Sequence, residues 1–339
     1  MTPTPGRRPA RVAVMGSGSW GTAFALVVSD AGHPVTMWAR RPELAARINR
    51  DHRNVDYFPS IALPESLVAV SDATQAMAGA DFVVLAVPSQ SLRANLGEWT
   101  IPAAASVVSL AKGIELGTGL RMSEVIAEAA GVQSERIAVV TGPNLAREIA
   151  ERQPSASVVA SAAERTAEAL QGICHTPRFR AYTNTDVVGC ELAGATKNVI
   201  ALAVGMAVGI GLGANATASV ITRGLAETTR LGVALGADPY TFSGLAGLGD
   251  LVATCSSPLS RNRTFGEELG KGRTVAAITA STRQVAEGVK SCASIQALAD
   301  RHGVEMPIVE HVAAVIAGDL SPTEMITALM SRSAKRERD

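Results

Sequence analysis

Short apolar runs alternate with helix-like segments through the first 185 or so residues of this chain. The runs are nearly continuous rather than alternating, which is typical of strands buried on both faces of a parallel sheet. Helical patterns separate them, for example at 22–29 and 72–78. The predicted strands cover 11–15, 33–39, 67–70, 81–87, 106–110, 136–141, 155–160 and 178–182. This order predicts a doubly wound α/β domain with helices on both faces of the sheet.

The pattern changes after residue 186, where segments rich in Ala, Gly and Leu take over with helical spacing. The predicted helices cover 187–207, 216–235, 241–255, 263–269, 275–279, 292–302 and 307–317. We therefore expect two domains: an α/β domain at 1–187 and an all-helical domain at 188–339.

One segment, 198–221, contains no charged residue and is long enough to cross a bilayer. Its hydrophobicity is modest because Ala and Gly dominate it. A helix that is apolar on all sides can also form the buried centre of a helical domain. We expect this second arrangement and no membrane span.

The first predicted strand leads directly into Gly-x-Gly-x-x-Gly at Gly16, Gly18 and Gly21, and a helix follows. This context is typical of a Rossmann-type dinucleotide site. Gly16 permits the tight turn, Gly18 allows a pyrophosphate to approach the backbone, and Gly21 allows close packing of helix and strand. The helix N-terminus offers N–H groups to the phosphates. The alternative is a glycine-rich loop that arose by chance.

Arg40 and Arg41 end the second predicted strand, where a site for NAD usually carries Asp or Glu. Paired guanidinium groups can hold the 2′-phosphate of NADP. The sequence thus favours NADP over NAD as the cofactor. The alternative is a solvated helix start before Pro42.

Composition narrows the class of protein further. The chain has 339 residues, 47% of them apolar, with 31 basic and 31 acidic residues and 4% aromatics. This balance argues against binding to nucleic acid or to an anionic membrane. The four cysteines form no metal or disulfide pattern, and no signal peptide precedes the first strand, so we expect a cytoplasmic protein.

Polar residues follow two central strands at the edge where doubly wound sheets bind ligands. Lys112 follows the strand at 106–110, and Gly142 and Asn144 follow the strand at 136–141. We expect all three to line the cofactor cleft. For Lys112 the alternative is an ordinary lysine in a surface loop.

The helical half contributes three clusters. Lys197 lies in an apolar helix, where desolvation favours the neutral amine and suits a general acid or base. The alternatives are a structural ion pair with Glu191 or a snorkelling side chain. Asp250 follows two glycines and could instead cap a helix. Ser260, Arg261 and Asn262 follow a proline and offer a dense anion site.

Taken in order, these motifs resemble the bacterial NAD(P)-dependent glycerol-3-phosphate dehydrogenases from Arg11 to about Ala328. The shared stretches are Gly16-Ser-Gly-Ser-Trp-Gly, Trp38-Ala-Arg, Ser109-Leu-Ala-Lys-Gly-Ile-Glu, Thr141-Gly-Pro-Asn-Leu-Ala, 191–198, Gly247-Leu-Gly-Asp-Leu, Ser260-Arg-Asn and Ala286-Glu-Gly-Val. The resemblance implies reversible NAD(P)H-dependent reduction of dihydroxyacetone phosphate to sn-glycerol 3-phosphate, which supplies the glycerol backbone of phospholipids.

The resemblance also implies residue roles, with Lys197 as the proton donor and acceptor. The substrate would contact Lys112, Gly142, Asn144, Lys197, Asp250, Ser260, Arg261 and Asn262. The cofactor would contact Gly16, Gly18, Ser19, Trp20, Gly21, Arg40, Arg41, Lys112, Ala146, Arg261, Val285 and Glu287. The family often has Ser or Thr where this chain has Asn144. We expect no metal, and the apolar helical domain favours a homodimer.

Two other classes also fit a dinucleotide domain joined to a helical one. A 3-hydroxyacyl-CoA or 6-phosphogluconate-type dehydrogenase is the first, but the hydroxyacyl enzymes need a catalytic histidine, and all five histidines lie outside the clusters. The second is a regulator that senses a dinucleotide, which would not require Lys197, Asp250 and the Ser-Arg-Asn cluster together.

Overall fold

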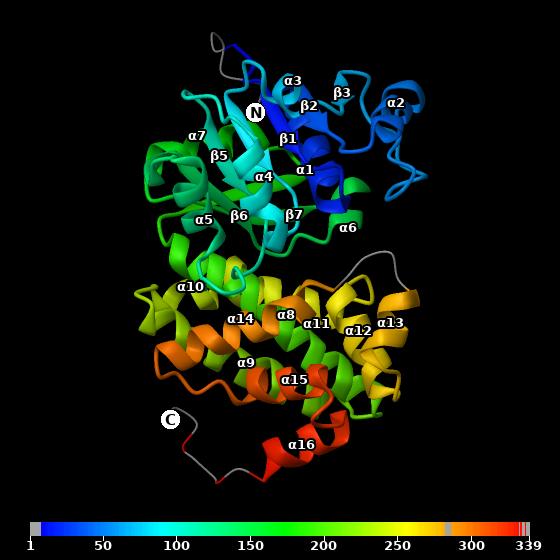
Figure 1. Cartoon of the computed structure of the whole chain (residues 1–339), viewed down its shortest axis with the longest axis vertical. Helices are drawn as coiled ribbons and strands as arrows, with labels where there is room; N and C mark the ends of the chain where they lie inside the picture. The colour runs from blue at the N-terminus through cyan, green and yellow to red at the C-terminus, as the bar shows by residue number, and fades with distance from the viewer. Residues whose placement is uncertain (1–7, 282–285, 332, 334–335, 337–339) are drawn as a thin grey trace.

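The first half of the chain forms one eight-stranded sheet flanked by helices, and the second half is helical (Figure 1). The computed structural model describes residues 8–281, 286–331, 333 and 336. The strands are β1 (Val12–Met15), β2 (Val35–Trp38), β3 (Leu67–Val70), β4 (Phe82–Leu85), β5 (Ser106–Ser109), β6 (Ile137–Thr141), β7 (Ser155–Ala160) and β8 (Phe179–Asn184). All eight were predicted.

The sheet order is β3-β2-β1-β4-β5-β6-β7-β8, with parallel pairing from β3 through β6. The topology therefore switches between β1 and β4, which is where doubly wound sheets bind their ligands. The predicted parallel sheet is confirmed for β1 to β6, but not at β7, which pairs antiparallel with β6. Helix α6 (Ala146–Ala150) has five residues and spans about 7 Å, too little to carry the chain back along β6.

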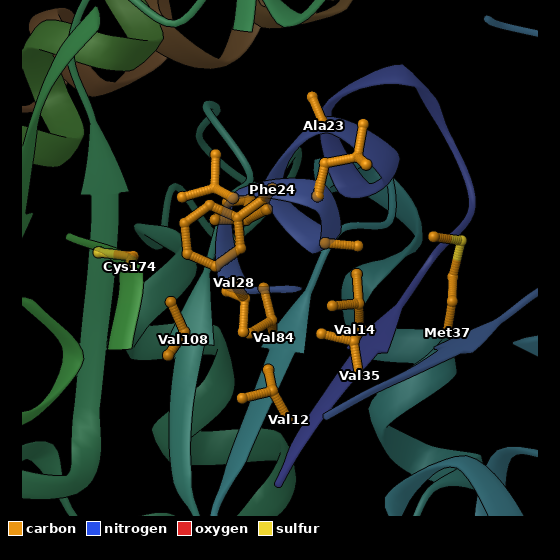
Figure 2. Packing of buried hydrophobic residues seen from close by; sticks show 14 of the residues in the cluster. Val12, Val14, Ala23, Phe24, Val28, Val35, Met37, Val84, Val108 and Cys174 are labelled. Carbon is orange, nitrogen blue, oxygen red and sulfur yellow. The ribbon is translucent and has the colours of Figure 1, made fainter. Parts of the chain in front are cut away.

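Helices cover both faces of this sheet. They are α1 (Ser19–Asp30), α2 (Pro42–Asp51), α3 (Ala73–Met77), η1 (Ser89–Ser91), α4 (Leu92–Glu98), α5 (Met122–Ala130), η2 (Ser134–Arg136), α6 and α7 (Glu164–Cys174). On one face, Phe24 and Val28 of α1 pack against Val14, Val84 and Val108 (Figure 2). The alternate strand residues pack against α4 and α5 on the other face. Burial on both faces explains the nearly continuous apolar runs.

The second half is helical. Its helices are α8 (Val187–Gly209), α9 (Ala214–Ala234), α10 (Pro239–Ser243), η3 (Leu245–Gly249), α11 (Asp250–Ser256), α12 (Arg261–Gly270), α13 (Val275–Ser281), α14 (Glu287–Arg301), α15 (Pro307–Ala317) and α16 (Pro322–Met330). The strand-to-helix change falls between β8 and α8, and the boundary at 187/188 stays our proposal.

Helix α8 is the core of this half. By length and composition it could cross a membrane, but 89% of an apolar 18-residue stretch within it is buried inside the protein. This burial is typical of a core helix. The uncharged segment 198–221 is not one helix, because α8 ends at Gly209 and α9 begins at Ala214.

Helix α12 packs unusually close to α8. A Cβ atom on Gly205 would lie 2.0 Å from the Arg263 carbonyl oxygen, and one on Gly266 would lie 2.1 Å from the Leu202 carbonyl oxygen. The two helices can therefore touch backbone to backbone only with glycine at these positions. This contact brings the start of α12 beside the middle of α8.

One prediction for the helical half was wrong, and one helix was missed. The single helix expected at 241–255 is divided into α10, the π-helical turn η3 and α11. Helix α16 was not predicted, although Ser321 and Glu324 form a capping box at its start. The division matters for function because it places Asp250 at the first position of α11.

Candidate functional site

The β1–α1 turn has the geometry of a phosphate-binding turn. Gly16 has φ +138°, and a Cβ atom there would lie 2.6 Å from the Ala86 carbonyl oxygen. A Cβ atom on Gly21 would lie 2.3 Å from the Gly16 carbonyl oxygen, whereas one on Gly18 would meet no atom within 4 Å. The turn is thus closely packed behind Gly16 and open at Gly18. Helix α1 begins next, at Ser19, with its N–H groups facing this opening.

A buried side chain that the sequence analysis missed supports this turn. Asn54 lies in the loop after α2, and its Nδ2 donates to the Ser17 carbonyl oxygen at 2.9 Å and to Thr22 Oγ1 at 2.8 Å. It therefore ties the turn to the start of α1. No local motif marks Asn54, because its partners lie 37 and 32 positions away.

Trp20 packs edge-on against Phe24, and its buried Nε1 has no partner in the part of the chain described.

Arg40 and Arg41 follow the carboxyl end of β2, and both are exposed. The Arg41 guanidinium pairs with Asp56, which raises the pKa of the arginine through that hydrogen bond. Arg41 is also the N-cap residue of α2, which begins at Pro42. The helix-start interpretation therefore describes the local structure, and both residues lie at the carboxyl end of β2.

Two lysines and an aspartate from opposite halves of the chain meet at the carboxyl end of the sheet. Lys112 Nζ lies 2.6 Å from Asp250 Oδ2 and 3.1 Å from the Gly142 carbonyl oxygen. Lys197 Nζ donates to Asp250 Oδ1. Asp250 is 1% exposed, so one buried carboxylate joins two ammonium groups across the domain boundary.

Burial lowers the pKa of Lys197 to about 8; Asp250 opposes this change and Lys112 adds to it. A pKa near the working pH suits a group that must both give and take a proton. The direction matches the sequence-based expectation of desolvation at Lys197. Thr254, one turn along α11 from Asp250, accepts a further hydrogen bond from Lys197 Nζ at 2.8 Å. Thr254 was not predicted, and only its i+4 spacing from Asp250 could have indicated it.

The alternative interpretation of Lys197 as the partner of Glu191 is wrong. Glu191 binds Arg121 Nη1 at 2.7 Å and the backbone N–H of Ser123 at 2.8 Å, whereas Lys197 pairs with Asp250. The two residues lie six positions apart on α8, which turns their side chains to different sides of the helix.

The loop after β6 lies next to Lys112. Gly142 supplies the carbonyl that Lys112 binds, and Ala146 begins α6. Asn144 Nδ2 donates to Ser157 Oγ at 3.1 Å, while its Oδ1 is buried without a partner among the described residues. An unpartnered buried acceptor is costly. This oxygen is therefore available to a hydrogen-bond donor on a ligand.

The Ser260-Arg261-Asn262 cluster forms the N-terminus of α12. Ser260 caps the helix by accepting a hydrogen bond from the Arg263 N–H. Asn262 Nδ2 donates to Asn198 Oδ1 at 2.9 Å, and Asn262 Oδ1 accepts from the Gly288 N–H at 2.9 Å. These bonds place the start of α12 beside Asn198, which follows Lys197 on α8. They also place it beside the start of α14, whose first residue is Glu287. Val285 lies outside the described residues.

The Lys112–Asp250–Lys197 contacts lie where the two halves of the chain meet. A separate cavity of about 880 Å³ lies between α9, α15 and α16, and none of the predicted site residues lines it. Among the described residues, no group of three or more His, Cys, Asp and Glu could hold a metal ion.

Comparison with known proteins agrees with this arrangement. Residues 11–167 match the family model for the NAD-dependent glycerol-3-phosphate dehydrogenase N-terminus, and residues 186–327 match the model for the C-terminus. "Glycerol-3-phosphate dehydrogenase [NAD(P)+]" of Streptomyces coelicolor is 63% identical over 98% of this chain and 99% of its own length. The protein of the same name from Thermobifida fusca is 63% identical over 97% of this chain and 98% of its own length.

Solved structures give the same result. The glycerol-3-phosphate dehydrogenase of Coxiella burnetii superposes with a TM-score of 0.91 at 36% identity, covering 96% of this chain and 99% of that one. The yeast enzyme gives a TM-score of 0.82 at 28% identity, covering 96% of this chain and 100% of that one. The chain belongs to the NAD-dependent glycerol-3-phosphate dehydrogenase family.

Proposed function

We propose that this protein catalyses the reversible NAD(P)H-dependent reduction of dihydroxyacetone phosphate to sn-glycerol 3-phosphate, with Lys197 as proton donor and acceptor. The observation that carries the proposal is the buried Lys112–Asp250–Lys197 network. It brings two ammonium groups together at the cofactor end of the sheet, where a carbonyl oxygen gains negative charge during reduction.

The turn after β1 fits a dinucleotide. Gly18 leaves the space that a pyrophosphate needs, and the buried Trp20 Nε1 has no hydrogen-bond acceptor among the described residues. Ser19 and Trp20 would hold the cofactor there, with Ala146 and Glu287 further along the cleft. The reduced nicotinamide supplies the hydride when it is bound.

The helical half binds the phosphate of the substrate. Arg261 offers a guanidinium fork, and the N-terminus of the ten-residue helix α12 adds backbone N–H groups and the positive end of its dipole. Ser260 and Asn262 complete this anion site. The carbonyl end of the substrate then faces Lys112 and Lys197.

Proton transfer follows the hydride. As the carbonyl carbon gains the hydride, its oxygen gains negative charge, which the Lys112 and Lys197 ammonium groups stabilise. Lys197 then gives its proton to that oxygen and becomes a neutral amine. Asp250 and Thr254 engage two N–H bonds of Lys197 and direct the third toward the substrate. In the reverse direction the amine takes the proton of the alcohol.

Arg40 and Arg41 support a preference for NADPH over NADH, because they can pair with a 2′-phosphate. The four cysteines are buried free thiols, which supports a reducing cytoplasmic location. The product supplies the glycerol backbone of phospholipids. We also propose a homodimer, supported by the apolar composition of the helical half.

The test is NADPH absorbance in the presence of dihydroxyacetone phosphate. We expect NADPH loss with stoichiometric formation of glycerol 3-phosphate. Dihydroxyacetone, which lacks the phosphate, is the matched control and should react far more slowly. Absence of NADPH oxidation, or equal rates with both substrates, contradicts the proposal. A hydroxyacyl-CoA dehydrogenase or a dinucleotide-sensing regulator would not oxidise NADPH with this substrate.

A further inference from the structure

Glu191 carries a buried carboxylate that crosses the domain boundary. It stands on the second turn of α8, and its partners stand at the start of α5 in the sheet domain. Glu191 Oε2 accepts hydrogen bonds from Arg121 Nη1 at 2.7 Å and Ser123 Oγ at 2.5 Å. Its Oε1 accepts the Ser123 backbone N–H at 2.8 Å. We call these three residues the α5–α8 clamp.

Burial of the charged groups of the clamp costs desolvation free energy. Glu191 is 7% exposed, and its burial raises the pKa of the carboxyl group. A buried ion pair adds little net stability compared with well-packed apolar residues, whereas removal of one partner is strongly destabilising. What the clamp adds beyond apolar packing is geometric, since three directed hydrogen bonds fix the carboxylate against the start of α5.

Neighbouring residues of α8 also contact the sheet domain. Cys190 packs with Val139 and Ala160 in an apolar cluster between the domains. A Cβ atom on Gly194 would lie 3.0 Å from Thr141 Oγ1 and 3.5 Å from Lys112 Cγ. The helix therefore lies directly on the strand ends and on the Lys112 side chain. Lys197 follows one turn later, about 4.5 Å along the helix axis.

We propose that Glu191 is a positioning residue that sets the place of Lys197 relative to Lys112. It contacts neither lysine, and it acts by fixing how α8 sits against the sheet domain. Cys190 and Gly194 let the helix approach, but apolar contacts tolerate sliding, whereas the clamp specifies one position. This inference rests on the proposed function, because its effect is measured as a loss of dihydroxyacetone phosphate reduction.

The test compares two glutamates that bind the same guanidinium. Glu191→Gln breaks the ion pair across the boundary. The matched control, Glu124→Gln, alters the pair that Arg121 makes within α5, where Glu124 Oε1 lies 2.7 Å from Arg121 Nη2. We expect kcat to fall about 10- to 100-fold in Glu191→Gln, as for a misplacement of about 1 Å. The KM for NADPH should stay within about two-fold, since the β1–α1 turn is untouched. Glu124→Gln should keep its kcat.

Two further variants keep the proposal testable if Glu191→Gln folds poorly. Ser123→Ala removes one hydrogen bond and leaves the ion pair, and should lower kcat about 3- to 10-fold. Glu191→Asp keeps the charge but shortens the side chain, and should not restore kcat. The proposal is overturned if Glu191→Gln and Ser123→Ala both keep the wild-type kcat, or if Glu191→Asp restores it fully. An inactive wild-type protein would instead overturn the proposed function.

Discussion

The two halves of the candidate site are built in different ways. In the cofactor half, the backbone makes the site: glycines shape the β1–α1 turn, and Gly18 leaves space for a ligand. In the reacting half, side chains make the site: Asp250 holds Lys112 and Lys197 together from 138 and 53 positions away. A short motif can therefore indicate binding of a dinucleotide, whereas the chemistry depends on the tertiary fold.

The difference also separates the expected effects of substitution. Changes in the cofactor half should act on cofactor affinity, because the turn contacts no reacting atom. Changes in the reacting half should act on turnover or on substrate affinity. Substitutions in the two halves should therefore have separable effects, largest at Lys197 and smallest at Arg40 and Arg41.

Replacement of the proton donor should have the largest effect. Lys197→Met should lower kcat about 10³-fold, within the usual contribution of a general acid. Asp250 keeps Lys112 as a partner, so the fold should survive. The Kd for NADPH, measured by fluorescence titration, should not change. The exposed Lys290, changed to Met, serves as the control. Near-normal turnover in Lys197→Met would rule out its assigned role.

The cofactor turn should respond in affinity alone. Gly18→Val should raise the Kd for NADPH about 100-fold, because the side chain would occupy the space proposed for the pyrophosphate. Thermal unfolding should be unchanged, since nothing lies within 4 Å of that position. Gly16→Ala is the contrasting variant and should lower the Tm, because its Cβ would meet the Ala86 carbonyl at 2.6 Å. A normal NADPH affinity in Gly18→Val would exclude this turn as the cofactor site.

Arg261 should govern substrate affinity. Arg261→Ala should raise the KM for dihydroxyacetone phosphate about 10- to 100-fold, the value of a hydrogen bond to a charged group. Steady-state kinetics with saturating NADPH measure this change. The control variant is Arg263→Ala. Arg263 lies two residues after Arg261 on α12, and its Nη1 lies 3.4 Å from Glu267 Oε2. An equal rise of KM in both variants would indicate a general loss of positive charge instead of a phosphate contact.

The two arginines after β2 should have the smallest effect. The double variant Arg40→Ala/Arg41→Ala should lower the preference for NADPH over NADH about 10-fold, since both groups are exposed and screened by water. The ratio of kcat/KM values for the two cofactors measures it. Arg47→Ala, which removes the other partner of Asp56, is the control. An unchanged ratio in the double variant would remove the basis for NADP preference.

Strands and helices followed from the sequence wherever the signal was local. Buried strands and the glycine turn each occupy a few consecutive residues, and the apolar pattern alone located them. Strand direction did not follow, because β7 has the same apolar pattern whether it runs parallel or antiparallel to β6. The sequence predicted one helix in place of α10, η3 and α11, because the helical spacing of apolar residues continues through all three.

The site was predictable residue by residue but not as a network. Lys197 stood out because a charge in an apolar helix is unusual. Its partner did not, because Glu191 was nearer in sequence than Asp250 and only the fold decides between them. Thr254 and Asn54 carry no motif, since each acts through one or two long-range hydrogen bonds. Their roles became visible only in the folded protein.

The central claim is that the Lys197 ammonium donates the proton during reduction, and its pH dependence tests this most directly. Because the pKa of Lys197 is lowered to about 8, the ammonium form predominates below that pH and is lost above it. The single-turnover rate of dihydroxyacetone phosphate reduction should therefore fall as pH rises through about 8, while the rate of glycerol 3-phosphate oxidation should rise over the same range. Lys197→Met should show neither change. A reduction rate that stays flat from pH ~6 to ~9.5 in the wild-type protein, or a fall that persists in Lys197→Met, would contradict the account.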